Sequence, residues 1–167
     1  MLTGAVWSAA VPNERIWPPP AKKTWQFYIS WLFFLLTIAL NILLIVLDWN
    51  SGTMLLFSRF SLGIPVIVIG CLLSFWGMAS LGLKNTSGLQ TRLIDTRPYR
   101  YMRNPQYIGY ILILIGISLV ANSRLAWIVN LLQAMVFIIV PMAEKSWLEE
   151  RYGEDYRKYK LRTQRFL

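Results

Sequence analysis

The chain has no histidine and a single cysteine, Cys71, among its 167 residues. Its own residues therefore cannot build a Ser–His–Asp triad, a zinc site of histidine and cysteine, a histidine-ligated haem or an internal disulfide. Charge is scarce too, because charged residues make up 15% of the chain, against about 25% in soluble domains. We therefore expect no metal site.

Apolar residues dominate what is present, at 56% of the chain. A helix that crosses a bilayer needs about 20 of them in succession. Four runs approach that length: Trp25 to Leu47, Leu62 to Leu83, Tyr107 to Val120 and Leu125 to Ala143. The third run is short for a full span. The pattern predicts an all-α fold, an integral membrane helical bundle with about four transmembrane helices.

Three regions follow from this pattern. Residues 1–24 form a polar, proline-rich lead-in, residues 25–83 hold two transmembrane helices, and residues 84–167 hold a polar loop, a helical hairpin and a charged C-terminal segment. The hairpin is expected because only a few polar residues separate the third and fourth runs. The C-terminal segment carries four residues at helical spacing, namely Leu148, Tyr152, Tyr156 and Tyr159. This spacing predicts an amphipathic helix on the membrane surface.

Two of the expected helices carry one distinctive face each. The first run has polar residues on a narrow face, namely Gln26, Ser30, Thr37 and Asn41. Such a face forms hydrogen bonds between helices or lines a cavity, and the first role is the more common. The second run has small residues on one face, namely Gly63, Gly70, Ser74 and Gly77. Small residues let a neighbouring helix approach closely.

The positive charges are placed unevenly along the chain, whose net charge is +9. Of the 17 lysines and arginines, all but Arg59 and Arg124 fall in segments that four spans would put on one side. Because positive loops stay cytoplasmic, we expect both termini and the 84–105 loop there, as in a multi-pass protein of a prokaryotic inner membrane. This placement favours anionic lipid headgroups, and not nucleic acid, as the partner of the charge.

The polar segments at the two ends of the hairpin meet at one membrane face. Asn104 is placed to cap a helix that begins at Pro105, and Gly109 near that start indicates a close approach of another group. Arg103 strengthens the positive end of the same helix. It therefore suits an anion, either a ligand carboxylate or phosphate or a lipid headgroup.

Glu144 lies at the end of the fourth run, on the helical face of Asn130 and Gln133. It follows Pro141, which removes a helical hydrogen bond and can kink the helix. An acidic residue at a membrane boundary is a functional candidate. The alternative is an ion pair with Lys145 or a loop arginine, which contributes little if exposed.

Together these segments resemble the isoprenylcysteine carboxyl methyltransferase and phospholipid methyltransferase superfamily of integral membrane proteins. The first motif of that superfamily is matched by Pro98, Tyr99, Arg100, Tyr101, Arg103, Pro105, Tyr107 and Gly109. The second is matched by Glu144, Leu148, Tyr152, Gly153, Tyr156 and Tyr159. The chain departs from the pattern at Arg97, usually glycine, at Asn104, often histidine, and at Lys145, usually a second glutamate.

The resemblance implies methyl transfer from S-adenosylmethionine to a lipid-like or isoprenylcysteine-type acceptor at the cytoplasmic membrane face. Glu144 would pair with a cationic part of the cofactor, while Tyr156 and Tyr159 would close over it. The cofactor-binding residues implied are Arg103, Asn104, Tyr107, Gly109, Glu144, Leu148, Tyr156 and Tyr159. The sulfonium of the cofactor is already activated, and no residue is an obvious general base. A carboxylate or thiolate acceptor would need none, whereas a phospholipid amine must lose a proton.

Two other functions are compatible with the same motifs. One is an NADPH-dependent, sterol-reductase-like protein, although such proteins are typically much longer. The other is a non-catalytic membrane protein that keeps the fold, which Lys145 and Arg97 favour. The sequence specifies neither the acceptor nor an oligomeric state.

Overall fold

The computed structural model describes residues 24–82 and 93–166. In these residues every regular element is an α-helix: α2 (Trp25–Leu47), α3 (Leu56–Leu81), α5 (Pro98–Tyr101), α6 (Pro105–Ala121) and α7 (Arg124–Arg162). Helices α2, α3 and α7 are long and apolar enough to cross a membrane, and α6 is a shorter apolar helix. The predicted all-α membrane bundle is confirmed. Most of the predicted lead-in, residues 1–23, and residues 84–92 of the predicted loop lie outside the described residues.

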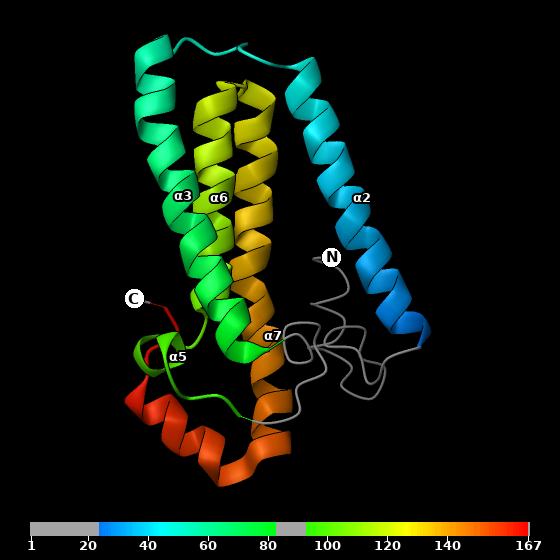
Figure 1. Ribbon diagram of the computed structural model, residues 1–167. Coiled ribbons are helices and arrows are strands. Elements are labelled where there is room, and N and C mark those ends of the chain that lie inside the picture. The colour runs from blue at the N-terminus through cyan, green and yellow to red at the C-terminus, as the bar shows by residue number, and fades with distance from the viewer. Residues whose placement is uncertain (1–23, 83–92, 167) are drawn as a thin grey trace.

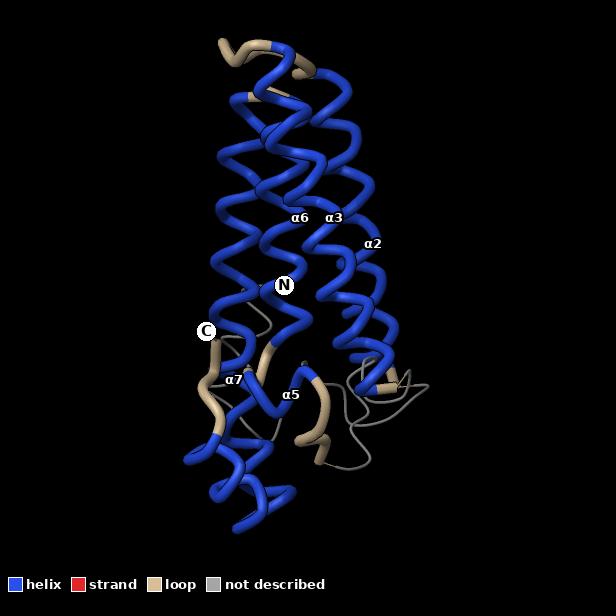
Figure 2. Tube along the Cα trace, turned by 60° about the vertical axis from the view of Figure 1, so that its left-hand side comes forward, coloured by secondary structure: helices blue, strands red, loops and turns tan. Residues whose placement is uncertain are grey.

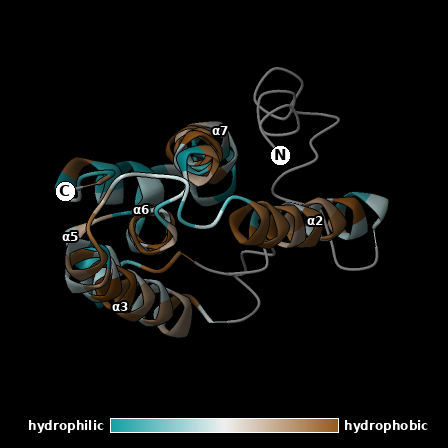
Figure 3. Cartoon of the chain, turned by 90° about the horizontal axis from the view of Figure 1, so that it is seen from above, coloured by the Kyte–Doolittle hydropathy of each residue, from teal (hydrophilic) through white to brown (hydrophobic). Residues whose placement is uncertain are grey.

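Successive helices of the bundle run in opposite directions (Figure 1). The bundle therefore has an α5 end, where α6 begins, and an opposite end, where residues 48–55 and 122–123 connect the helices. Seen along the bundle, α6 lies between α3 and α7, while α2 stands to one side and contacts α7 (Figure 3). In the described part of the chain, only Arg59 and Arg124 among the basic residues lie at the opposite end.

Helix α3 packs against α6 along the predicted face of small residues. A side-chain carbon added to Gly70 would lie 2.8 Å from the carbonyl oxygen of Gly109. One added to Gly116 would lie 2.9 Å from the carbonyl oxygen of Gly63. Distances this short leave no room for a side chain, so the backbones themselves are in contact. The expectation that small residues admit a neighbouring helix is confirmed.

Helix α3 begins at Leu56, earlier than the predicted start of the apolar run at Leu62. Arg59 therefore lies inside the helix. Its side chain is only 3% exposed and binds the carboxyl end of α6. Both its Nε and its Nη2 donate to the carbonyl oxygen of Val120, at 3.1 and 2.6 Å. The last carbonyls of a helix lack partners within the helix. Arg59 therefore supplies hydrogen-bond donors to the last carbonyls of α6. Its charge does not mark the start of α3.

The polar face of α2 forms hydrogen bonds between helices at Asn41. The Nδ2 of Asn41 donates to the Oδ1 of Asn130 in α7 at 2.6 Å. The Nδ2 of Asn130 donates in turn to the hydroxyl of Ser118 in α6 at 2.8 Å. Thr37 differs, because its hydroxyl donates to the carbonyl of Phe33 in its own helix. The interhelical interpretation is thus confirmed at Asn41, where one chain of bonds joins three helices.

Asp48 holds the connection at the opposite end of the bundle. Its carboxylate accepts hydrogen bonds from the hydroxyl of Ser123 and from the backbone N–H of Leu125 at 3.0 Å. Ser123 is also the N-cap of α7, where its hydroxyl accepts from Ala126. These bonds, that of Ser123 above all, hold the pKa of Asp48 below its usual value. A carboxylate is favoured at a helix N-terminus, so Asp48 anchors α2 to α7.

Helix α7 continues through Glu144 without interruption, so the end of the fourth apolar run is not the end of a helix. Pro141 lies inside the helix and does not break it. The break comes at Gly153, whose φ of 51° and ψ of −126° are not helical. Residues 124–152, the long arm, descend past the α5 end, and residues 154–162, the return arm, fold back beneath it (Figure 1). Tyr152 and Tyr156 therefore belong to different arms and not to one helical face.

Candidate functional site

Glu144 lies on the long arm where the helix leaves the apolar part of the bundle. About 20 residues span the hydrocarbon, and counting them from Arg124 ends near Glu144. The Glu144 side chain is only 7% exposed. Its Oε1 accepts a hydrogen bond from the hydroxyl of Tyr107 at 2.8 Å. The ring of Tyr107 stacks on that of Phe137, with centroids 5.9 Å apart. The start of α6 and the long arm thus bring residues of both motifs into contact.

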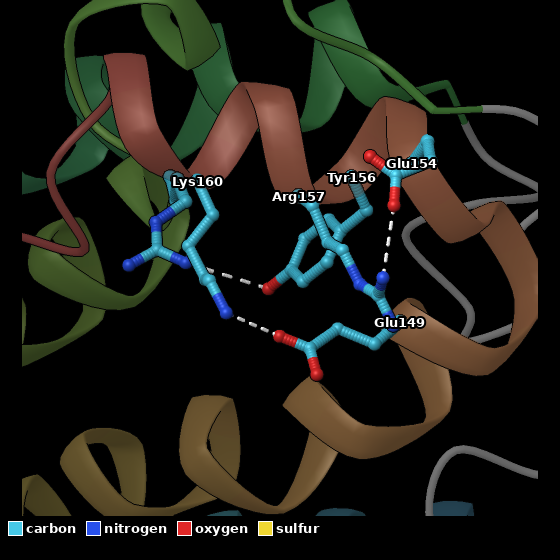
Figure 4. Close-up of polar contacts among 6 residues, drawn as sticks. Glu149, Glu154, Tyr156, Arg157 and Lys160 are labelled. Carbon is cyan, nitrogen blue, oxygen red and sulfur yellow. Dashed lines mark hydrogen bonds and ion pairs between the residues drawn. The ribbon is translucent and has the colours of Figure 1, made fainter.

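Arg103 lies just before α6 and points toward the return arm. Its Nη1 donates to the hydroxyl of Tyr156, the tyrosine labelled in Figure 4, across 3.5 Å, a long hydrogen bond. Its Nε is buried and has no hydrogen-bond partner. A buried donor without an acceptor costs about 1–3 kcal/mol. Arg103 is therefore suited to an acceptor group of a ligand.

A cluster of tyrosines fills the space between α5 and the return arm. Tyr99, Tyr156 and Tyr159 are buried together, and Leu148 packs against them from the long arm. The hydroxyl of Tyr159 donates to the carbonyl oxygen of Tyr99 at 2.6 Å. Burial is the main cause that raises the pKa of Tyr99 above its usual value. The cluster fixes the return arm beneath the bundle, so Leu148 and Tyr159 build the wall of the site.

An ion pair holds the two arms of α7 together across the turn at Gly153. Lys160 on the return arm pairs with Glu149 on the long arm (Figure 4). Lys145 lies within electrostatic reach of the same Glu149, one helical turn away. Neighbouring residues of a helix point about 100° apart. Position 145 therefore lies on a different side of the helix from Glu144 and within electrostatic reach of Glu149.

Asn104 does not cap α6, contrary to the prediction. It is the N-cap residue, but its side chain makes no capping hydrogen bond. Instead its Nδ2 donates to the carbonyl oxygen of Arg165 at 3.0 Å. The C-terminal segment that it binds, residues 163–166, we call the strap; it runs beside the start of α6 (Figure 2). Local spacing could not reveal this contact, because Arg165 lies 61 residues after Asn104 in the sequence.

Gly109 lies apart from this group. An added side-chain carbon would lie 2.2 Å from the Ser74 hydroxyl oxygen and 2.7 Å from the carbonyl oxygen of Gly70. Both atoms belong to α3, which therefore already makes the close approach that the glycine allows. The structure thus brings together seven of the eight implied residues around the base of α6 and places Gly109 in the helix seam. Among the described residues, no three histidine, cysteine or acidic side chains cluster as metal ligands do.

Comparison with known proteins identifies the family. The model of the phospholipid methyltransferase family matches residues 58–155, more than half of the chain. The chain belongs to this family. It is also 33% identical over 66 residues to an uncharacterized protein of Haemophilus influenzae. The matched residues make up 36% of this chain and 98% of that protein. No solved structure matches. The family match includes the Tyr107–Glu144 pair but ends before Tyr156 and the strap.

The departure from the phospholipid methyltransferase pattern at Arg97 has a backbone consequence. Arg97 has φ 57° and ψ −129° and is the residue before α5. Residues with a side chain rarely adopt such a conformation, which glycine adopts readily. Glycine at this position is therefore explained by the turn into α5, without any contact with a ligand.

Replacing Arg97 by glycine should stabilise the protein. A strained backbone conformation costs about 1–3 kcal/mol, and the greater freedom of glycine in the unfolded chain offsets part of the gain. We expect a net increase of about 1 kcal/mol, measured as a higher Tm in detergent. Arg100→Gly is the matched control, because it removes the same charge inside α5 and should lower the Tm. Equal shifts in both variants would contradict the strain at Arg97.

Proposed function

We propose that this protein transfers a methyl group from S-adenosylmethionine to a lipid-like or isoprenylcysteine-type acceptor at the membrane face of the α5 end. The observation that carries the proposal is the Tyr107–Glu144 pair. It joins both motifs, it lies within the family-matched residues, and its carboxylate is buried where the apolar part of α7 ends. A carboxylate buried at this place can pair with a cationic group of a ligand.

The residues present fit the cofactor. The sulfonium of S-adenosylmethionine supplies an activated methyl group, so the protein mainly has to position and desolvate it. Glu144 offers a carboxylate for the cationic amino group, and Arg103 offers a buried, unpartnered Nε for the carboxylate. Tyr156 and Tyr159 cover the site from the return arm. Leu148 supports these tyrosines, Asn104 holds the strap, and Gly109 lets α3 approach α6.

The same placement supports a membrane-borne acceptor and a cytoplasmic site. Tyr107 and Glu144 lie where the hydrocarbon ends, so an acceptor could present its polar group without leaving the bilayer. The basic residues of the described chain gather at the α5 end, apart from Arg59 and Arg124. Because positive loops face the cytoplasm, we assign the α5 end and the strap to that side.

Calorimetry with S-adenosylmethionine on the full chain in detergent tests the proposal. We expect saturable binding in the range of ~1 µM to 1 mM that enzymes show for their substrates. Transfer of a radiolabelled methyl group to a total lipid extract or to an isoprenylcysteine analogue then identifies the acceptor class. A folded protein that binds no S-adenosylmethionine would refute the proposal. Binding without transfer to either acceptor would refute the acceptor class and keep the cofactor.

A further inference from the structure

The strap is attached to the start of α6 by main-chain and side-chain bonds. Met102 and Gln164 pair as in a parallel sheet, and the N–H of Arg103 donates to the carbonyl oxygen of Gln164 at 2.9 Å. Asn104 adds its bond to the carbonyl of Arg165. Three successive residues before α6 thus set the register of the strap. This register brings position 165 to the Arg103–Tyr156 contact.

At this contact the guanidinium of Arg103 and the positive charge of Arg165 lie within reach of one hydroxyl, together with the carboxylate of Glu144. Among the described residues, neither Arg103 nor Arg165 takes part in any of the ion pairs. Electrostatic interaction reaches the Tyr156 hydroxyl from both arginines. Like charges repel each other unless an anion lies between them. The Nε of Arg103 is buried and unpartnered at the same place, which marks where an acceptor atom would bind.

The first turn of α6 adds a third favourable group. The side chain of Asn104 is committed to the strap and leaves the first N–H groups of α6 without a side-chain cap. Uncapped N–H groups and the helix dipole both favour an anion at a helix N-terminus. Arg103, the uncapped amides and the Tyr156 hydroxyl therefore all offer hydrogen-bond donors at the start of α6.

We propose that the strap completes an anion-binding pair, in which Asn104 positions Arg165 beside Arg103 to bind an anionic group of a substrate. The proposal rests on the proposed function for the identity of the substrates. The anionic group is either the carboxylate of S-adenosylmethionine or a phosphate of the acceptor. Arg165 is then a binding residue and Asn104 a positioning residue. Both the strap and Tyr156 lie beyond the family-matched residues.

The first experiment compares Arg165→Gln with Arg162→Gln in the full chain. Arg162 is a matched control, because it lies on the surface beside Asp95, 3.6 Å away. Calorimetry measures binding of S-adenosylmethionine, of its decarboxylated analogue and of glycerol 3-phosphate. A lost charge-assisted hydrogen bond weakens binding about 10- to 100-fold. If the cofactor carboxylate is bound, R165Q weakens S-adenosylmethionine by this factor and leaves the decarboxylated analogue unchanged.

If a phosphate is bound instead, R165Q weakens glycerol 3-phosphate and leaves both forms of the cofactor unchanged. Either result supports the anion pair. Equal behaviour of R165Q and R162Q toward all three probes would overturn it, as would a wild type that binds none of them. A wild type that binds glycerol 3-phosphate but not S-adenosylmethionine would refute the proposed function and keep the anion pair.

The role of Asn104 is tested by a double-mutant cycle. If Asn104 acts only by placing Arg165, then N104A and N104A/R165Q should weaken anion binding as much as R165Q alone. In R165Q, adding N104A should therefore have no further effect. N104A that binds the anion like the wild type would overturn the positioning role. Additive losses in the double variant would do so too, because they would show that Asn104 acts by another route.

Discussion

Gly109→Ala is expected to be among the most destabilising single substitutions in this protein. The added methyl group would lie 2.2 Å from the hydroxyl oxygen of Ser74 and 2.7 Å from backbone atoms of Gly70 and Ser74. A side chain can rotate away, but the backbone of α3 cannot move without separating the two helices. Overpacking of a core costs about 1–3 kcal/mol, and we expect the upper part of this range, measured as a fall in Tm in detergent.

Gly77→Ala is the matched control for this substitution, because it lies in the same seam. There the added carbon would approach Gln106 no closer than 3.2 Å. The helix propensity gained, up to about 1 kcal/mol, can offset so mild a contact, and we expect little change in Tm. If G109A keeps the Tm of the wild type but no longer binds S-adenosylmethionine, Gly109 serves the ligand and not the seam.

The helices and the small-residue seam could be predicted because each depends on local periodicity. Apolar runs of sufficient length can only be helices in a bilayer, and the glycine face of α3 follows from spacing alone. The errors arise where a residue acts over a long distance. Arg59 carries a charge inside α3 because its hydrogen bonds go to the carbonyls of α6, which sequence spacing does not reveal.

The candidate site could be predicted in its members but not in their arrangement. The motifs named Tyr107 and Glu144, and the structure joins them by a hydrogen bond. The helical spacing of the tyrosines suggested one face, but the positive φ of Gly153 divides them between two arms. Local rules predict that Asn104 caps a helix, as asparagine before proline commonly does. Its bond to the strap cannot be predicted locally, because the strap is distant in sequence.

Glu144→Gln is expected to weaken binding of S-adenosylmethionine by about 10²- to 10³-fold, since loss of one partner from a buried charge pair costs about 3–5 kcal/mol. Glutamine has nearly the same shape, and its amide oxygen can still accept the hydrogen bond of Tyr107. The fold should therefore be kept, with a Tm near that of the wild type. The loss of binding would then report the missing charge and not a damaged helix.

Tyr107→Phe separates the charge of Glu144 from its orientation. It removes the hydrogen bond at 2.8 Å but leaves the carboxylate and the stacking on Phe137. A hydrogen bond to a charged group contributes about 1.5–3 kcal/mol, and only the part that orients the carboxylate bears on the ligand. Binding should therefore weaken about tenfold, less than in E144Q. If Y107F and E144Q weaken binding equally, the carboxylate acts through the tyrosine and does not itself pair with the cofactor.

Glu150→Gln is the control for net charge in the same arm, because Glu150 is exposed. It should bind S-adenosylmethionine as the wild type does, since an exposed carboxylate is screened by water and salt. The comparison of E144Q with E150Q by calorimetry therefore isolates the buried charge. Binding of both variants within threefold of the wild type would show that Glu144 only holds α6 and α7 together. The cofactor would then have to be placed by the arginines and tyrosines at the start of α6.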